Sequence, residues 1–200
     1  KKENANQYKR FFLFIVKKDI LMSKPEWLKI WTPTGTGIQN YSQVKQTVKG
    51  LGLTTVCEEA KCPNISECWS GGTATFMVLG DTCTRGCRFC HVKTAKNGQA
   101  IDAFEPYKLG QAIKSFGLKY VVITSVDRDD LEDQGAGHFA KCIMEAKRQN
   151  PELFIEVLIP DFRADTKCLD TIISAQPDVI AHNIETVKRL QTRVRDRRAN

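Results

Sequence analysis

Six of the eight cysteines in this 200-residue chain lie in one short stretch, from Cys57 to Cys90. The last three, Cys83, Cys87 and Cys90, are spaced Cys-x3-Cys-x2-Cys and follow an apolar run that predicts a β-strand. Thiolates are the usual protein ligands of iron–sulfur clusters, and three on one loop can hold three irons of a [4Fe–4S] cluster. The fourth iron is then open to the amine and carboxylate of a small molecule.

A structural zinc ion is the alternative ligand for this loop. Structural zinc usually takes four ligands, often in paired Cys-x2-Cys units, and the loop supplies only three cysteines. His91 is the nearest further donor, but it adjoins Cys90, and coordination by both neighbours would be strained. The spacing therefore favours an iron–sulfur cluster.

A second set, Cys57, Cys62 and Cys68, has the spacing Cys-x4-Cys-x5-Cys. It again offers three thiolates, and it fits no common zinc pattern. We therefore expect a second metal site. Cys142 and Cys168 fall in or beside helical patterns, and we interpret them as small buried apolar residues.

The charge and the cysteine usage limit the class of protein. Residues 1–50 carry ten Lys and Arg against three acidic residues, so the net charge of +7 lies entirely in this part of the chain. Such an arm could steer an acidic protein, a nucleic acid or an anionic membrane, or be a solvated leader. The apolar run 11–16 is too short to span a bilayer and lacks a signal-peptide cleavage site. Clustered cysteines without a secretory signal favour a reducing compartment.

The elements that must position these cysteines alternate between strand and helix from residue 75 onward. Short runs rich in β-branched residues predict buried parallel strands over 75–79, 120–123, 154–159 and 179–181. Apolar spacing of three and four predicts helices around 109–116 (ended by Gly117), 139–148 and 169–173, the last with a cap at Asp165. The alternation indicates an α/β fold with a parallel sheet, open or closing into a barrel.

Polar residues follow each predicted strand, where the chemistry of such folds is found. They occupy 81–90, 124–130, 160–163 and 182–185. The second segment fails as a calcium loop, because Leu131 and Glu132 stand where a ligand and a glycine are needed; a solvated acidic turn is its simpler alternative. In the last segment, strand periodicity places Asn183 and Glu185 on one face, which suits a ribose or amino-acid head group. A helix cap at Thr186 is the alternative there.

The loop with Phe89 before its last cysteine resembles the radical S-adenosylmethionine (SAM) superfamily, and the first cysteine set resembles the lipoyl synthase family within it. The likeness runs from about residue 24 to the end, with departures at 93–100 and at Gln134. It implies a partial (β/α)6 radical SAM barrel, truncated after about four β–α units and carrying an N-terminal extension. The corresponding parts are a basic leader (1–23), an extension with the auxiliary-cluster cysteines (24–74) and the partial barrel (75–200).

The resemblance also implies roles for individual residues. One [4Fe–4S] cluster would bind Cys83, Cys87 and Cys90, and an auxiliary one Cys57, Cys62 and Cys68. The family completes the auxiliary cluster with a serine near its C-terminus, and no counterpart is visible here, so we expect the chain to be a fragment. The implied SAM contacts are Phe89, Ser125, Asn183, Glu185 and Arg195. The alternative role for Phe89 is packing in the core, and the alternative for Arg195 is a position at a solvated helix end. We interpret His182 as a structural residue.

The activity implied is insertion of two sulfur atoms at C6 and C8 of a protein-bound octanoyl group, with no protein acid or base, since clusters and SAM carry the chemistry. Implied partners are an octanoylated carrier domain, a ferredoxin- or flavodoxin-type electron donor and cluster delivery proteins, without nucleic acid or a membrane span. The compartment would be the cytoplasm of a bacterium, or a mitochondrion or plastid. The alternatives are another two-cluster radical enzyme such as a methylthiotransferase, and a non-enzymatic metal-stabilised binding module.

Overall fold

The computed structural model describes residues 29, 32–71 and 73–199. The expected basic leader, residues 1–23, lies outside this described part. Residues Thr32–Asn200 form one compact unit, and the following description concerns that unit alone. None of the helices in the described ranges is long and apolar enough to span a membrane.

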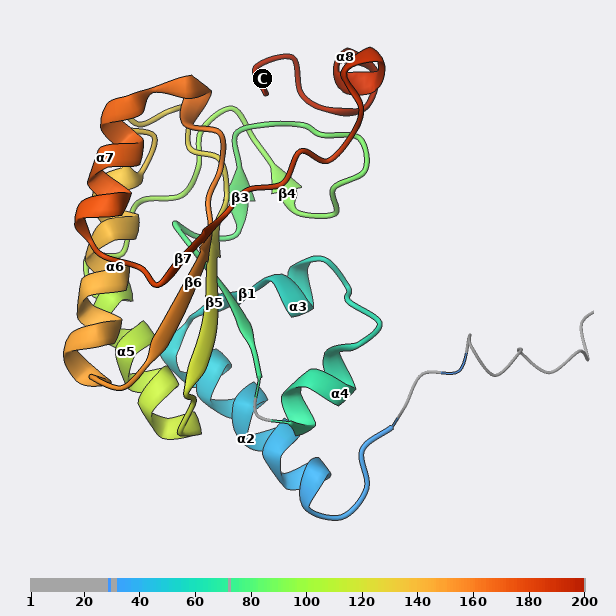
Figure 1. The fold of residues 1–200 in the computed structure, drawn as a ribbon. Coiled ribbons are helices and arrows are strands. Elements are labelled where there is room, and N and C mark those ends of the chain that lie inside the picture. The colour runs from blue at the N-terminus through green and yellow to red at the C-terminus, as the bar shows by residue number, and fades with distance from the viewer. Residues whose placement is uncertain (1–28, 30–31, 72, 200) are drawn as a thin grey trace, which may run out of the picture. The chain divides into compact units, whose positions relative to one another are not determined.

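A five-stranded sheet in the order β1-β2-β5-β6-β7 forms the centre of the unit (Figure 1). Its four parallel strands are β2 (Thr75–Val78), β5 (Tyr120–Ser125), β6 (Phe154–Leu158) and β7 (Val179–Ala181). All four strands expected from the sequence are confirmed, with ends shifted by at most two residues. The register aligns Met77, Thr124, Leu158 and Ala181 in one row across the sheet, so the four strands end together.

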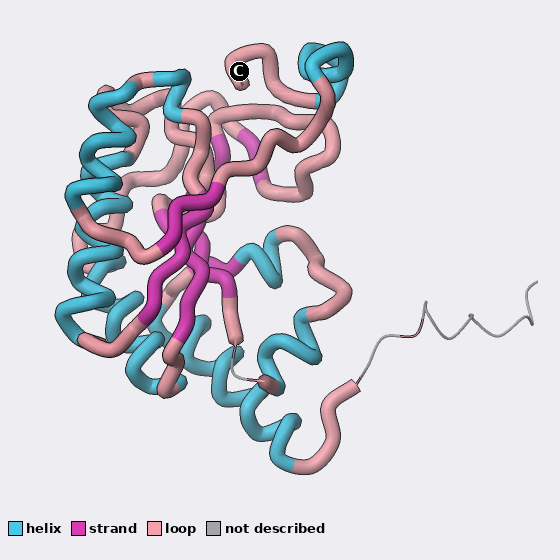
Figure 2. The backbone as a smooth tube through the Cα atoms, in the orientation of Figure 1, coloured by secondary structure: helices cyan, strands magenta, loops and turns pink. Residues whose placement is uncertain are grey.

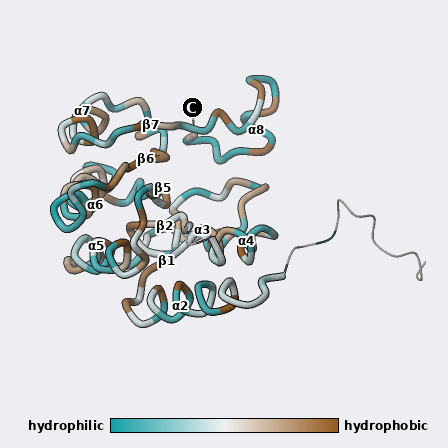
Figure 3. The backbone as a smooth tube through the Cα atoms, turned by 60° about the horizontal axis from the view of Figure 1, so that its bottom comes forward, coloured by the Kyte–Doolittle hydropathy of each residue, from teal (hydrophilic) through white to brown (hydrophobic). Residues whose placement is uncertain are grey.

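Three helices cover one face of the sheet: α5 (Glu105–Phe116), α6 (Ala136–Gln149) and α7 (Thr166–Ser174). Gly117 ends α5 in the left-handed conformation, and the Asp165 side chain caps α7 by accepting from the Lys167 N–H, so both predicted boundaries are confirmed. The strands β5 and β6 are largely hydrophobic, whereas the helices alternate between hydrophobic and hydrophilic residues (Figure 3). The fully buried core residues include Leu109, Ile113, Val121, Ile123, Phe139, Ile143, Ile155 and Ile172.

Residues 32–71 add α2 (Thr36–Leu51), β1 (Thr54–Thr55), α3 (Val56–Glu59) and α4 (Ile65–Ser70). β1 pairs antiparallel with β2, so this segment extends the sheet by one edge strand. α3 and α4 lie on the side of the sheet opposite α5–α7 (Figure 1). Trp69 is fully buried, and its ring lies 5.3 Å from that of Tyr41 on α2. The described residues of the extension thus pack on the sheet.

Loops and short elements gather beyond the carboxyl ends of the parallel strands (Figure 2). They include β3 (Thr82–Cys83), β4 (Lys93–Thr94), η2 (Phe162–Ala164), η3 (Lys188–Leu190) and α8 (Gln191–Val194). Two expectations are wrong here. The strand ends at Ala181, so period-two alternation does not extend to Glu185, which has a positive φ of 64°. No helix starts at Thr186, because the next turn begins at Lys188 with Val187 at its cap.

Candidate functional site

A pocket opens where the parallel strands end. It is lined by residues of the loops that follow β2, β5, β6 and β7, and by the segment after α8. This convergence follows from the common direction of the strands, which brings the ends of distant segments to one edge. Among the lining residues are all eight that the sequence associates with the first cluster and with SAM: Cys83, Cys87, Phe89, Cys90, Ser125, Asn183, Glu185 and Arg195.

The three cysteines of the cluster-binding loop, which we define as residues 82–90, differ in their exposure to solvent. Cys83 is buried, Cys87 is half-buried and Cys90 is exposed. Two backbone N–H groups point at sulfur: that of Arg85 lies 3.4 Å from Cys83 Sγ, and that of Asp196 lies 3.3 Å from Cys87 Sγ. Hydrogen bonds to cysteine sulfur are a feature of iron–sulfur sites, where they adjust the potential of the cluster. The donor set therefore fits a cluster held by three thiolates.

The thiol of Cys83 lies beside a carboxylate, with its Sγ 3.6 Å from Asp127 Oδ2. Burial, together with this neighbouring negative charge, raises the pKa of Cys83 to about 12. Burial also raises the pKa of Asp127, against the opposing effect of Arg85. In the absence of iron, the site therefore favours the protonated thiol at Cys83.

Two buried polar atoms in the pocket have no hydrogen-bond partner within the described chain. They are the hydroxyl oxygen of Ser125 and the Nε of Arg195. A buried guanidinium nitrogen or hydroxyl without a partner costs free energy, and native proteins rarely leave one unpaired. An anionic group near Arg195 and a polar group near Ser125 would satisfy both atoms, as the carboxylate and amine of an amino acid can.

The other expected contacts also lie at this pocket. Phe89 is 55% exposed, which excludes the alternative that it is simply a core residue. Asn183 and Glu185 both line the pocket, although irregular backbone and not a strand presents them. His182 Nδ1 hydrogen-bonds the Ile159 carbonyl at 2.9 Å, in agreement with a structural role for this residue.

The second cysteine set forms a separate group around α3 and α4 and does not line the pocket. Cys57 is on α3, Cys62 is on the connection and Cys68 is on α4. The Cys62 N–H donates to the Cys57 carbonyl at 3.0 Å. Burial, and then the electrostatic effect of Cys57 and Cys62, raises the pKa of Cys68. The helix pair and its connection therefore supply three cysteines, the number of thiolates that the first cluster-binding loop also offers.

A buried ion network in the wall of the pocket was not predicted from the sequence. Arg85, between two cluster cysteines, bonds Asp129 and Asp161, and all three side chains are at least 94% buried. Burial lowers the pKa of an arginine, but these bonds raise that of Arg85 above its usual value, and they lower the pKa of Asp161 although burial alone would raise it. The alternative of a solvated acidic turn after β5 is therefore wrong. The sequence feature that could have indicated this network is the arginine within the Cys-x3-Cys-x2-Cys motif.

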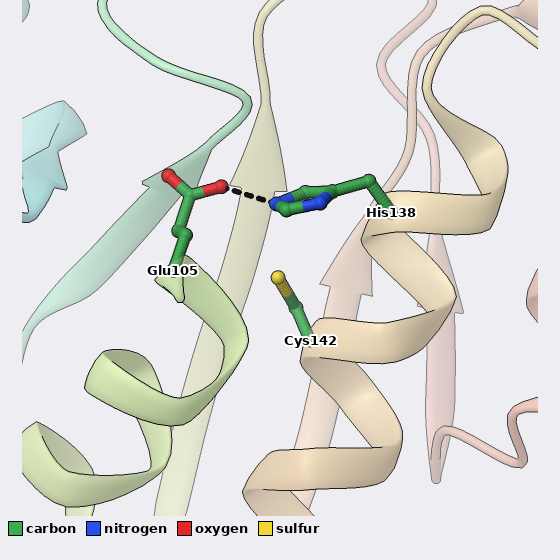
Figure 4. A group of neighbouring side chains, drawn as sticks. All are labelled: Glu105, His138 and Cys142. Carbon is green, nitrogen blue, oxygen red and sulfur yellow. Dashed lines mark hydrogen bonds and ion pairs between the residues drawn. The ribbon is translucent and has the colours of Figure 1, made fainter. Parts of the chain in front are cut away.

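A second buried group, Glu105, His138 and Cys142, lies between α5 and α6 (Figure 4). Its ligand atoms lie within 4.8 Å of one another, as those of a metal site would. His138 Nε2 and Glu105 Oε2, however, are 2.6 Å apart. Two ligands of one zinc ion, each about 2.0–2.1 Å from it in tetrahedral geometry, lie roughly 3.3 Å apart. The contact is therefore a direct hydrogen bond, and the carboxylate also accepts from the Leu79 N–H at 3.0 Å.

Comparison with known proteins finds two matching family models. Residues 77–200 match the radical SAM superfamily, and residues 2–62 match the N-terminal domain of lipoyl synthase of the radical SAM family. The chain is 55% identical over 184 residues to a mitochondrial lipoyl synthase of Vitis vinifera, covering 90% of this chain and 46% of that protein. It is 55% identical over 181 residues to those of Bos taurus and Homo sapiens, covering 88% of this chain and 48% of each. The chain thus spans about half the length of these relatives.

Proposed function

We propose that this chain, which belongs to the radical SAM superfamily, is the N-terminal and central part of a lipoyl synthase. The proposed reaction inserts two sulfur atoms at C6 and C8 of an octanoyl group bound to a carrier protein. The observation that carries the proposal is the pairing of two separate cysteine sets, only one of which lines the pocket. One set can thus serve radical generation while the other serves sulfur donation.

In the proposed mechanism, a [4Fe–4S] cluster with SAM supplies radical hydrogen abstraction, and a second cluster supplies sulfur. Cys83, Cys87 and Cys90 would hold the first cluster. Arg195 would bind the SAM carboxylate with its unpartnered Nε, and Ser125 would contact the amine. These two atoms are already buried at the pocket wall, so they would orient the ligand without a large rearrangement.

The remaining proposed contacts are made by Asn183, Glu185 and Phe89. Asn183 and Glu185 would bind the ribose or the amino-acid head group, and the exposed ring of Phe89 would lie against the adenine. The second cluster would be held by Cys57, Cys62 and Cys68, around α3 and α4. Spatial separation keeps the two iron sites chemically distinct, which is what a reaction that consumes one of them requires.

The wider architecture and setting are part of the same proposal. The parallel sheet would be the first part of a (β/α)6 barrel, with residues 24–74 as an extension. The partners would be an octanoylated carrier domain, a ferredoxin- or flavodoxin-type electron donor and cluster delivery proteins. The proposed compartment is a mitochondrion or plastid for a eukaryotic source and the cytoplasm for a bacterial one. The relatives from Vitis vinifera and Homo sapiens are named mitochondrial, which supports the mitochondrion.

The proposal is tested with the intact protein, reconstituted anaerobically with iron and sulfide. We expect about eight irons and no zinc per chain, as two four-iron clusters require. Single turnover with SAM and an octanoylated carrier peptide should yield a doubly thiolated peptide by mass spectrometry. A methylthiolated product, or a protein that binds zinc in place of iron, would refute the proposal.

The SAM contacts are tested separately by ligand binding. Arg195→Met should weaken SAM binding about tenfold or more, because it removes a charge-assisted contact. Ser125→Ala should weaken binding less, since a neutral hydrogen bond contributes about 1 kcal/mol. Arg148→Met, at an exposed arginine on α6, is the matched control and should bind SAM normally.

A further inference from the structure

One guanidinium joins three loops in the wall of the pocket. Arg85 Nε and Nη2 donate to the two oxygens of Asp129, each at 2.8 Å, and Nη1 donates to both oxygens of Asp161, at 2.8 and 2.7 Å. Asp129 belongs to the loop after β5, and Asp161 to the loop after β6. The Arg85 side chain is only 1% exposed, so these bonds form out of water, where geometry matters most.

Charge balance within this network depends on the C-terminal segment. Arg85 also lies 3.3 Å from Asp127, so three carboxylates surround one guanidinium. Arg195 Nη2 lies 3.8 Å from Asp161, and Arg198 Nη1 lies 3.4 Å from Asp129. Arg198 Nε also lies 2.9 Å from Asp196, so three arginines face four aspartates, drawn from four separate segments of the chain. Loss of one member of such a network leaves a buried charge without its partner, which is costly.

Stability alone is a poor explanation for such a network. Removing charges from water is costly, and apolar side chains in the same space often give equal or greater stability. What the network supplies is a fixed relation among the loops. Arg85 stands between Cys83 and Cys87, and its own N–H contacts Cys83 Sγ at 3.4 Å. The same residue therefore holds a cluster sulfur with its backbone and two neighbouring loops with its side chain.

We propose that Arg85 is a positioning residue, which sets the cluster-binding loop at the correct distance and angle from the loops after β5 and β6. The inference rests on the proposed function, because those loops carry or support the candidate SAM contacts Ser125 and Arg195. The open iron and both polar contacts must reach the amino-acid part of one SAM molecule at once. Because the guanidinium of Arg85 hydrogen-bonds both loops, it links the position of the cluster-binding loop to the positions of the two polar contacts.

The first test needs no cluster and measures backbone hydrogen exchange in the apo protein. Four N–H groups between residues 84 and 88 donate to other segments or to sulfur. We expect Arg85→Gln to speed exchange there about tenfold or more, since it removes charge-assisted bonds. Exchange within α5 and α6 should stay unchanged. Arg85→Lys keeps the charge but lacks the planar fork, and it should fall between the wild type and Arg85→Gln.

The second test measures SAM binding and the spectrum of the reduced cluster. Both variants should retain wild-type iron, whereas SAM affinity should fall about tenfold in Arg85→Lys, because geometry and not charge is lost. The change in the electron paramagnetic resonance signal on adding SAM should weaken in parallel. Arg148→Gln, which removes an exposed pair with Glu145, is the control and should change neither measurement.

Two outcomes would overturn the inference. If Arg85→Lys matched the wild type in loop exchange and in SAM affinity, the fork would have no positioning role. If Arg85→Lys instead lost protection throughout α5 and α6, Arg85 would be a general scaffold residue. The proposed function can fail independently of this inference. A wild-type protein that bound neither iron nor SAM would contradict the proposed function, but hydrogen exchange in the Arg85 variants would still report on the positioning role.

Discussion

The backbone N–H of Gly86 donates to the carboxylate of Asp196, 110 residues later in the chain, at 2.9 Å. Around this bond the Arg88 N–H donates to the Val194 carbonyl, and Arg198 Nη2 donates to the Thr84 carbonyl at 2.6 Å. The segment after α8 therefore acts as a strap across the cluster-binding loop. The two segments meet because both follow strands of one parallel sheet.

This strap leads to a prediction for Asp196. Replacing Asp196 with Ala removes the acceptor of the Gly86 N–H and the partner of Arg198, so the loop should open more often. We expect a chelator to remove iron about tenfold faster from Asp196→Ala, consistent with loss of one charge-assisted bond. Asp196→Asn keeps an acceptor and should lose iron at an intermediate rate. Equal rates in all three proteins would contradict the strap.

The two cysteine sets should behave as independent iron sites, since only one lines the pocket. Cys87→Ala should remove about four of the eight irons and abolish SAM cleavage. Cys62→Ala should also remove about four irons but leave SAM cleavage partly intact while sulfur transfer is lost. Iron analysis and 5′-deoxyadenosine release measure the two effects. Normal SAM cleavage in both variants would show that the assignment is wrong.

Cys142 and Cys168 should have no part in metal binding. Both are buried, Cys142 beside the hydrogen-bonded pair Glu105 and His138 and Cys168 with its thiol donating to the Asp133 carbonyl at 3.3 Å. Burial raises the pKa of each thiol, most strongly that of Cys142. Replacing either by Ala should leave the iron content unchanged, at a cost of about 1 kcal/mol in the free energy of unfolding. Denaturant titration with parallel iron analysis tests this. Loss of a complete cluster from either variant would be incompatible with the separation seen here.

Asp178 should make the stability of the sheet depend on pH. Its carboxylate accepts from the Ile155 N–H at 2.8 Å, and this bond lowers the pKa of Asp178. A carboxyl group whose pKa is lower in the folded than in the unfolded protein stabilises the folded state. This stabilisation is fully present at a pH above the pKa of the unfolded protein, about 3.9, and it is lost as the pH falls through the lower pKa of the folded protein. We expect Asp178→Ala to lower the free energy of unfolding by about 1 kcal/mol at pH 7 and less at pH 3.

The control for this prediction is Asp170→Ala, on the solvent side of α7. Its carboxylate makes no hydrogen bond or ion pair among the described residues, so neither pH should reveal a comparable loss. A deficit in Asp178→Ala that is the same at pH 3 and pH 7 would exclude the electrostatic explanation.

Much of this protein could be predicted from the sequence, because the signals involved are local. Strand and helix order follow from apolar periods of two and of three to four, which depend only on near neighbours. The two cysteine sets are read from spacing, since loop ligands must lie close together in the chain. Predicting the candidate SAM contacts also required the rule that the carboxyl ends of parallel strands lie at one edge of the sheet. The structure places the candidate SAM contacts at one pocket together with Cys83, Cys87 and Cys90.

Tertiary structure alone decided the long-range contacts. The bonds of Arg85 to Asp161 and of Gly86 to Asp196 depend on the path of loops that no periodic pattern describes. The expected strand alternation at Asn183 and Glu185 failed for the same reason, since a left-handed turn at Glu185 replaces it. Charges near cysteines are visible in any sequence, but whether they are solvated or buried against one another is set only when separate loops pack together.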